Sequence, residues 1–177
     1  NKTCPYETCI IYQKNLPKFR VDIQPIIGIT NLSKEFLFYD FAIDNRKFKP
    51  YFQCGFLSYF WMPNESEKLF FQTGIIYIRN DESYYRNSYV NYSYYYQQEK
   101  GAIKIPIKFH YQLLRSRVTP VFNLGFNGYF TYFDYYAIVY SLGLGINTKI
   151  NNKISINLSA ENEAFSFTYN FGVIIKL

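Results

Sequence analysis

Apolar and polar residues alternate over long segments of this chain, and this pattern restricts the fold more than any other feature. In FRVDIQPIIGIT (residues 19–30), every second residue from Phe19 is apolar. The same alternation runs through residues 102–113, 153–161 and 165–177. A period of two residues is that of a β-strand with one apolar face. The pattern therefore predicts an all-β protein.

Four further segments, 49–62, 69–79, 118–131 and 136–149, are also expected to be strands. Their less apolar face carries glycines, which suit a narrow, strongly curved barrel; these are Gly55, Gly74, Gly125, Gly143 and Gly145. The eight segments exceed the usual length of about five or six residues in soluble proteins. They match the roughly nine to eleven tilted residues that cross a bilayer.

The connections between these segments largely alternate between long and short. The long ones are 32–47 and 80–100, whereas 63–68, 115–117 and 151–152 are short. Membrane β-barrels combine short periplasmic turns with longer external loops. The rhythm favours an eight-stranded antiparallel up-and-down transmembrane β-barrel over residues 19–177, preceded by a short N-terminal periplasmic arm at 1–18.

The distribution of charge favours the membrane form of the barrel. Charged residues make up 18% of the chain and few of them lie on the expected strands, whereas a soluble exterior mixes both signs densely. No apolar run approaches the roughly 18 residues of a transmembrane helix. A soluble lipocalin-type barrel that binds an apolar ligand stays open as the alternative.

Aromatic residues, 22% of the chain, cluster near the ends of two expected strands. Because Tyr and Trp favour membrane interfaces, we expect these clusters to form girdles at the two interfaces. The clusters are Tyr59, Phe60 and Trp61, and Tyr129, Phe130, Tyr132 and Phe133.

The face opposite the apolar one is expected to line the interior of the barrel. Side chains fill an eight-stranded barrel, so we expect a polar, hydrogen-bonded plug and no wide channel. The expected lumen network consists of Arg20, Asp22, Gln24, Lys104, Lys108, His110 and Glu161.

Catalysis, metal binding and nucleic-acid binding are not expected. His110 is the single histidine, its candidate carboxylates Glu161 and Glu163 lie on another strand, and the spacing identifies no nucleophile. A lipid-modifying outer-membrane enzyme stays open as a second alternative. One histidine and no second cysteine pair predict no metal site and no cofactor. The formal charge of +6 comes from scattered residues, so nucleic acid is not an expected partner.

Two further segments are candidate contact regions. In the arm, Cys4 and Cys9 form either a short disulfide loop or two free thiols, and the arm is long enough to dock a partner. The loop at 80–100 is rich in tyrosine, which gives contact area at low entropic cost, although part of it alternates like an extended strand. Its tyrosines are Tyr84, Tyr85, Tyr89, Tyr92, Tyr94, Tyr95 and Tyr96.

The chain resembles the small porin-like outer-membrane β-barrel proteins of Bacteroidetes, most clearly from residue 101 onward. The resemblance covers about residues 19–177 and rests on IKIPIKFHYQL, VTPVFNLGFNGYF, SLGLGINTKINNKISINLSAE and the terminal strand. The matching positions are Pro106, Pro120, Gly143, Gly145 and Asn151-Asn152-Lys153. The resemblance implies a structural or interaction role in the outer membrane, after removal of a signal peptide, and no assigned ligand.

The terminal residues also match the signal that bacterial barrels present to their assembly machinery. Asn170, Gly172, Ile175 and Leu177 fill its polar, glycine and hydrophobic places, although its usual last residue is Phe. The resemblance thus implies the barrel assembly machinery as a partner during insertion. The transmembrane barrel predicts contact with outer-membrane lipid, and the arm is the segment expected to dock a protein within a larger outer-membrane assembly.

Overall fold

The computed structural model describes residues 18–33, 48–62, 66, 68–79, 83–86, 95–98, 101–113, 116–131, 136–163 and 166–177. Eight long strands form one sheet: β1 (Arg20–Ser33), β2 (Phe48–Trp61), β3 (Leu69–Arg79), β6 (Gly101–Gln112), β7 (Val118–Thr131), β8 (Tyr136–Lys149), β9 (Ile154–Glu163) and β10 (Ser166–Lys176). Two short strands, β4 (Ser83–Arg86) and β5 (Tyr95–Gln98), form a separate two-stranded sheet. Within these residues, no helix has the length and apolar character needed to span a membrane.

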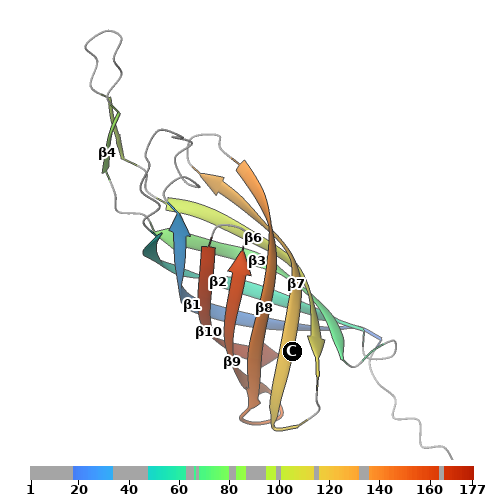
Figure 1. The fold of residues 1–177 in the computed structure, drawn as a ribbon. Coiled ribbons are helices and arrows are strands. Elements are labelled where there is room, and N and C mark those ends of the chain that lie inside the picture. The colour runs from blue at the N-terminus through green and yellow to red at the C-terminus, as the bar shows by residue number, and fades with distance from the viewer. Residues whose placement is uncertain are drawn as a thin grey trace, which may run out of the picture.

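The long sheet closes into an antiparallel up-and-down barrel, which confirms the predicted fold class. Strands adjacent along the chain pair with each other, β3 pairs with β6, and β10 pairs with β1. Figure 1 shows β2, β3 and β6 crossing the direction of β8, β9 and β10, because strands on opposite walls tilt in opposite directions. Closure leaves the barrel without an unpaired edge.

The register of the eight pairings fixes the stagger of the barrel. When the paired residues are followed from strand to strand around the barrel, starting at Asp22, the path returns to β1 at Leu32, ten residues further along the strand. The intermediate residues are Tyr59, Gln72, Lys108, Gly125, Ser141, Glu163 and Ser166. Ten residues of stagger over eight strands require a strand tilt of about 40°.

Inward-facing glycines allow neighbouring strands to approach closely where the wall curves. A Cβ on Gly74 would strike the backbone carbonyl oxygen of Phe56, and one on Gly125 would strike that of Ile107. The predicted placement of glycine on the less apolar face is thereby confirmed at these positions.

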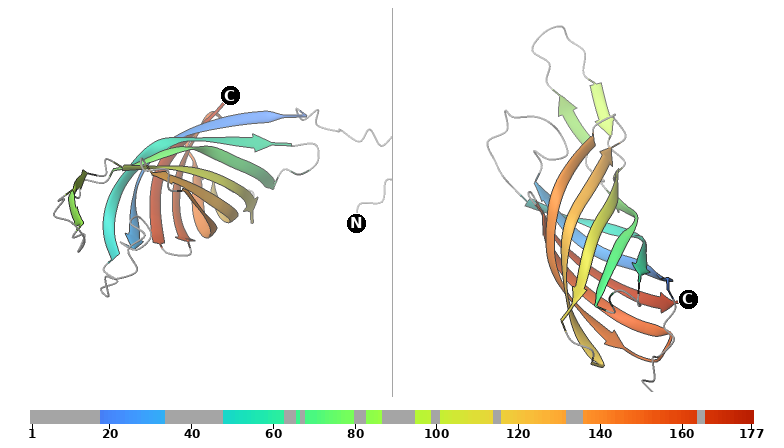
Figure 2. Two further views of the ribbon diagram at one scale, coloured as in Figure 1. Left: turned by 90° about the horizontal axis from the view of Figure 1, so that it is seen from above. Right: turned by 90° about the vertical axis from the view of Figure 1, so that its right-hand side faces the viewer.

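The barrel has two unlike ends. The terminus end holds the start of β1, the end of β10 and the connections 62–68, 113–117 and 150–153. The loop end holds the connections 34–47, 80–100, 132–135 and 164–165. Figure 2 shows the C-terminus at the terminus end and the β4–β5 hairpin beyond the opposite end.

Large apolar side chains cover the outside of the barrel, whereas polar side chains dominate the buried positions. The residues predicted to share the apolar face of β1, β6, β9 and β10 do share one face, and this face points outward on each strand. Among the most exposed apolar residues are Phe56, Ile75, Phe109, Ile138, Tyr140, Leu144, Leu158 and Tyr169. This is the inverse of a soluble barrel and the arrangement of a membrane barrel.

Candidate functional site: the barrel interior

The interior contains all seven side chains of the predicted lumen network. Six of them are buried: Asp22, Gln24, Lys104, Lys108, His110 and Glu161. The seventh, Arg20, is half-buried at the terminus end, where its guanidinium lies 3.0 Å from the Asp22 carboxylate and over the Trp61 ring. The seven residues do not form one cluster, and each charged member has its own partner.

Glu163 is the centre of the polar contacts near the loop end. Its carboxylate pairs with the ammonium group of Lys104 and accepts a hydrogen bond from the Tyr129 hydroxyl. The Thr168 hydroxyl donates to it at 3.2 Å and lies 2.8 Å from the hydroxyl of Thr30. Lys104 and Glu163 are fully inaccessible to solvent. Glu163 thus connects strands β6, β7 and β10 from its own position at the end of β9.

A second ion pair lies deeper in the barrel, between Lys108 on β6 and Glu161 on β9. The Lys108 ammonium nitrogen is 2.5 Å from the Glu161 carboxylate, and both side chains are buried. Strands β6 and β9 are separated by β7 and β8 in the wall, so this pair spans the interior. Opposite charges that pair across the lumen reduce the cost of burying each of them.

A relay of neutral hydrogen bonds follows the wall from β6 to β8. His110 lies 2.6 Å from the amide oxygen of Gln72, and the Gln72 amide donates to the Tyr59 hydroxyl at 3.3 Å. The Tyr59 hydroxyl donates to Gln24, whose amide donates to Asn157 at 3.1 Å. The relay ends where the Asn157 amide donates to Asn147 at 2.6 Å. It joins six strands through side chains alone.

Apolar side chains are also buried in the interior, which the sequence patterns did not predict. One cluster extends from the terminus end up to and past the relay and includes the Tyr59 ring; it consists of Ile26, Leu57, Tyr59, Trp61, Phe70, Ile76, Val121 and Ile174. The cluster at the loop end consists of Leu32, Tyr51, Ile78, Ala102, Tyr129 and Val139. The central cavity, between Tyr59, His110 and Glu161, measures about 10 Å³, which is at most the space of a single water molecule.

The predicted aromatic girdles are wrong for three of their residues. Tyr59, Trp61 and Tyr129 point into the barrel and are buried. Trp61 stacks on Phe70 at a centroid distance of 4.0 Å, and Phe70 stacks on His110 at 4.8 Å. Three consecutive aromatic residues on a strand cannot share a face, so only Phe60 of its group faces outward.

The outer aromatic band at the terminus end consists of phenylalanines instead. Phe60 contacts Phe19 and Phe71, and Phe71 contacts Phe109. Tyr132 and Phe133 of the second predicted girdle lie outside the described residues.

No carboxylate is hydrogen-bonded to His110 among the described residues. Its ring bonds to Gln72 and packs on Phe70, while Glu161 and Glu163 pair with lysines. No group of three or more potential metal ligands occurs in the part of the chain that the structure describes. The ion pairs and hydrogen bonds connect strands across the interior, and no acid–base pair is assembled among the described side chains.

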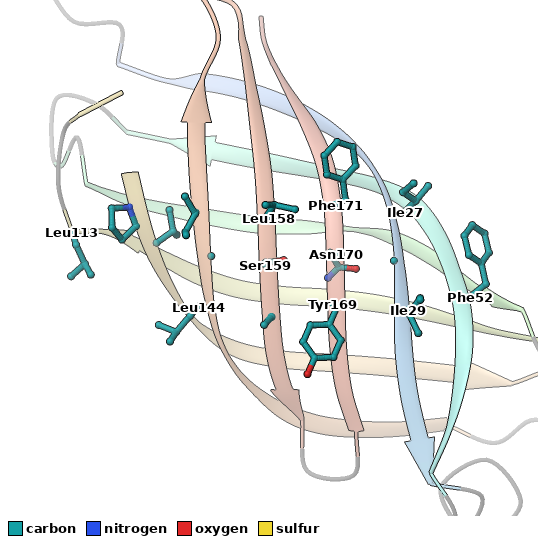
Figure 3. A pocket seen from close by; sticks show the side chains of 16 residues that line it. Ile27, Ile29, Phe52, Leu113, Leu144, Leu158, Ser159, Tyr169, Asn170 and Phe171 are labelled. Carbon is teal, nitrogen blue, oxygen red and sulfur yellow. The ribbon is translucent and has the colours of Figure 1, made fainter. Parts of the chain in front are cut away.

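The outer surface carries a shallow apolar groove across β7, β8, β9, β10, β1 and β2. The groove encloses about 940 Å³, and Figure 3 shows side chains from several strands along it. Ala160 forms a low point between Leu144 and Tyr169, its partners on the two neighbouring strands. The groove belongs to the apolar exterior and is separate from the lumen.

The residues of the predicted terminal signal lie on β10 or directly after it. Asn170 and Gly172 face the interior, whereas Ile175 and Leu177 face outward. Asn170 accepts a hydrogen bond from the Gln53 amide at 2.5 Å.

Several predicted sites fall partly or wholly outside the described residues. These are residues 1–17 of the arm, with Cys4 and Cys9, and Tyr89, Tyr92 and Tyr94 of the tyrosine-rich loop. Tyr84 and Tyr85 belong to β4, and Tyr95 and Tyr96 to β5, which pair backbone to backbone. Cys54, on the outward face of β2, is a free thiol.

The chain is similar to several solved structures, of which Neisserial surface protein A supports the fold assignment. Neisserial surface protein A superposes with a TM-score of 0.53 at 12% identity, over 91% of this chain and 98% of that one. The attachment invasion locus protein Ail of Yersinia pestis gives a TM-score of 0.47 at 8% identity, over 89% of this chain and 95% of that one. The designed protein TMB2.3 gives 0.46 at 8% identity, over the same two shares.

No protein-family model matches the chain, and no curated protein matches its sequence. The Bacteroidetes family assignment therefore stays a prediction. At 12% identity, the likeness to Neisserial surface protein A concerns the fold alone. This chain has the fold of the small eight-stranded outer-membrane barrels.

Proposed function

We propose that this protein is an integral outer-membrane β-barrel with a plugged lumen, which serves as a structural or interaction module and does not conduct solutes. The observation that carries the proposal is the inversion of the barrel. Bulky apolar side chains point outward from all eight strands, and the ion pairs and hydrogen-bond relay point inward. Only a lipid environment makes such an exterior favourable over its whole height.

The closed lumen has two physical supports. Two ion pairs and a six-residue relay bridge the interior, and two apolar clusters fill the space around them, one extending from the terminus end and one at the loop end. The central cavity is close to the size of one water molecule. Ions that entered would have to break the Lys–Glu pairs and cross dry apolar layers, which is costly.

The two alternatives raised by the sequence fit this geometry less well. A lipocalin-type barrel needs a polar exterior and an apolar cavity for its ligand, whereas the apolar groove here lies outside. A lipid-modifying enzyme needs a nucleophile beside a base, whereas His110 contacts Gln72 and Phe70.

The first experiment tests the membrane assignment by fractionation. The protein expressed in a Gram-negative host should partition into the outer membrane and migrate on unheated gels as a compact, heat-modifiable species. Recovery of a folded protein without detergent would overturn the assignment.

The second experiment tests closure by planar-bilayer recording, with a sixteen-stranded porin as the positive control because such barrels leave an aqueous channel. The reconstituted protein should give no steady single-channel steps under conditions that resolve the porin. Large, steady steps from the folded protein would refute the plug.

An interaction role would be carried by segments outside the barrel wall. We propose the tyrosine-rich segment 84–96 and the N-terminal arm as partner-binding regions, and the terminal strand as the segment recognised by the assembly machinery. A pull-down from detergent extracts tests the first two, with wild type compared with a variant whose 87–94 segment is replaced by Gly-Ser residues. Recovery of the wild type only as a monomer would count against a larger assembly.

A further inference from the structure

A row of basic residues follows the rim of the barrel at the terminus end. Five consecutive wall strands, β7, β8, β9, β10 and β1, each have a cation at or directly next to their end on this side; these are Arg117, Lys149, Lys153, Lys176 and Arg20, and Lys18 precedes Arg20 by two residues. Backbone hydrogen bonds place them side by side: the Lys149 amide donates to Arg117, and the Lys176 amide donates to Lys153. We call these five residues the basic arc.

The positive charge of the arc is largely uncompensated within the described residues. Asp22 is the described side-chain carboxylate at this level, and it pairs with Arg20. The other interior carboxylates, Glu161 and Glu163, pair with lysines higher in the barrel. Glu65 and Glu67, in the connection between β2 and β3, lie outside the described residues. A run of five cations with few counter-charges creates a field that attracts anions.

The arc faces the mouth of the barrel and is set back from the surrounding lipid. Each cation lies two residues from a buried, inward-facing side chain, namely Thr119, Asn147, Ser155, Ile174 or Asp22. The neighbouring outward positions at the same level are apolar and exposed; they are Phe19, Val118, Ile150, Ile154 and Ile175. An anionic lipid headgroup at the barrel exterior would meet this apolar rim first.

The interior beyond the arc is closed, so an anion attracted to it cannot pass through. Trp61 and Phe70 stack on each other just inside, and Ile174 belongs to the same apolar cluster. The arc is therefore a binding surface and not the vestibule of an anion channel.

The dimensions of the arc suit an extended peptide. Four of the eight interstrand spacings of about 4.8 Å, widened by the tilt, run around half of the rim, so the ends of the arc lie roughly 15 Å apart across the mouth. An extended chain crosses that distance with about four or five residues. The positive charges are spread along this length, so a single small anion would reach only part of the arc.

We propose that the basic arc binds an acidic peptide segment of a partner protein on the side of the membrane that the terminus end faces. The side of the membrane on which the peptide binds rests on the membrane function proposed above, whereas binding of the peptide to the arc requires only the folded barrel. Carboxylates spaced along an extended segment complement cations on successive strands.

The test uses the full chain folded in nanodiscs of neutral phosphatidylcholine and a fluorescent octaglutamate peptide, with binding followed by anisotropy. Binding should saturate at low salt and weaken several-fold when the ionic strength rises, because the contacts are exposed charges. The variant Lys149→Gln/Lys153→Gln/Lys176→Gln should bind about tenfold more weakly. The matched control, Lys49→Gln/Arg79→Gln/Arg86→Gln, removes three charges from the loop side of the barrel, on β2, β3 and β4, and should bind like wild type.

Heat-modifiable gel mobility of the same samples establishes that each variant is folded. A folded wild-type barrel that fails to bind octaglutamate, or an equal loss in both triple variants, would overturn the basic-arc proposal and leave the membrane function standing. A third result would also overturn it. In this result, the wild-type protein in nanodiscs that contain phosphatidylglycerol no longer binds the peptide, and the wild type prefers that lipid whereas the arc variant does not. The arc would then be a lipid site.

Discussion

Removal of the Glu163 carboxylate should destabilise the barrel far more than removal of the lysine that it pairs with. Glu163 has three donors, Lys104, Tyr129 and Thr168, whereas the ammonium group of Lys104 has Glu163 as its charge partner in a site closed to solvent. In Glu163→Gln the buried ammonium loses its direct ion-pair partner, and breaking such a pair from one side costs about 3–5 kcal/mol. In Lys104→Met the carboxylate keeps two hydroxyl donors, so we expect a smaller loss, about 1–3 kcal/mol.

The double variant Lys104→Met/Glu163→Gln should recover much of this loss. It buries no charge, and the glutamine can still accept a hydrogen bond from Tyr129. We therefore expect it to be more stable than Glu163→Gln alone, with a coupling energy of about 2–4 kcal/mol between the two sites.

The assay is reversible urea unfolding in detergent micelles, followed by the fluorescence of Trp61, the single tryptophan. Trp61 reports directly on the interior because it stacks on Phe70. Lys153→Met in the turn after β8 serves as the control and should change stability by less than about 0.5 kcal/mol. Additive losses in the double variant, or a cost below about 1 kcal/mol for Glu163→Gln, would refute the reasoning.

Two further predictions concern the wall of the barrel. Gly125→Ala should lower the free energy of unfolding by about 1–3 kcal/mol, because the new methyl group strikes the carbonyl oxygen of Ile107. Gly128→Ala, on the outward face of the same strand, should be nearly neutral. Equal unfolding free energies of the two variants in urea titrations would contradict the close strand approach. Leu144 is 63% exposed on the apolar surface, and Leu144→Arg should make the free energy of folding into bilayers less favourable by about 2–4 kcal/mol. Asn151→Arg, in the turn after β8, should not have this effect. Equal folding yields of the two variants would argue against a lipid-facing position for Leu144.

The sequence was sufficient to predict the strands and their faces, because alternation depends only on neighbours along one strand. On β1, the outward Ile27 and Ile29 and the inward Asp22 and Gln24 follow from period two alone. Alternation also predicts the inward glycines. It could not distinguish an aromatic residue in a girdle from one in the core where several are consecutive, as at Tyr59, Phe60 and Trp61.

The pairing of side chains across the lumen could not be predicted in the same way. Lys108 meets Glu161 only because β6 and β9 face each other at one particular stagger, and that stagger accumulates over all eight strand pairings. Ile26, Ile76 and Ile174 illustrate a second limit. Each is an apolar residue on the polar face of its strand, and their common cluster becomes apparent only when the barrel is closed.

Adjacent residues on β2 report which face of the barrel wall points to lipid and which points inward. Trp61 points into the barrel and is 7% exposed, whereas Phe60 faces outward at nearly the same depth. The measurement is tryptophan quenching by lipids brominated near the top of their acyl chains, for wild type and for the variant Phe60→Trp/Trp61→Phe. The account predicts weak quenching of Trp61 and strong quenching of the tryptophan at position 60. Strong quenching of Trp61 with weak quenching at position 60 would contradict it.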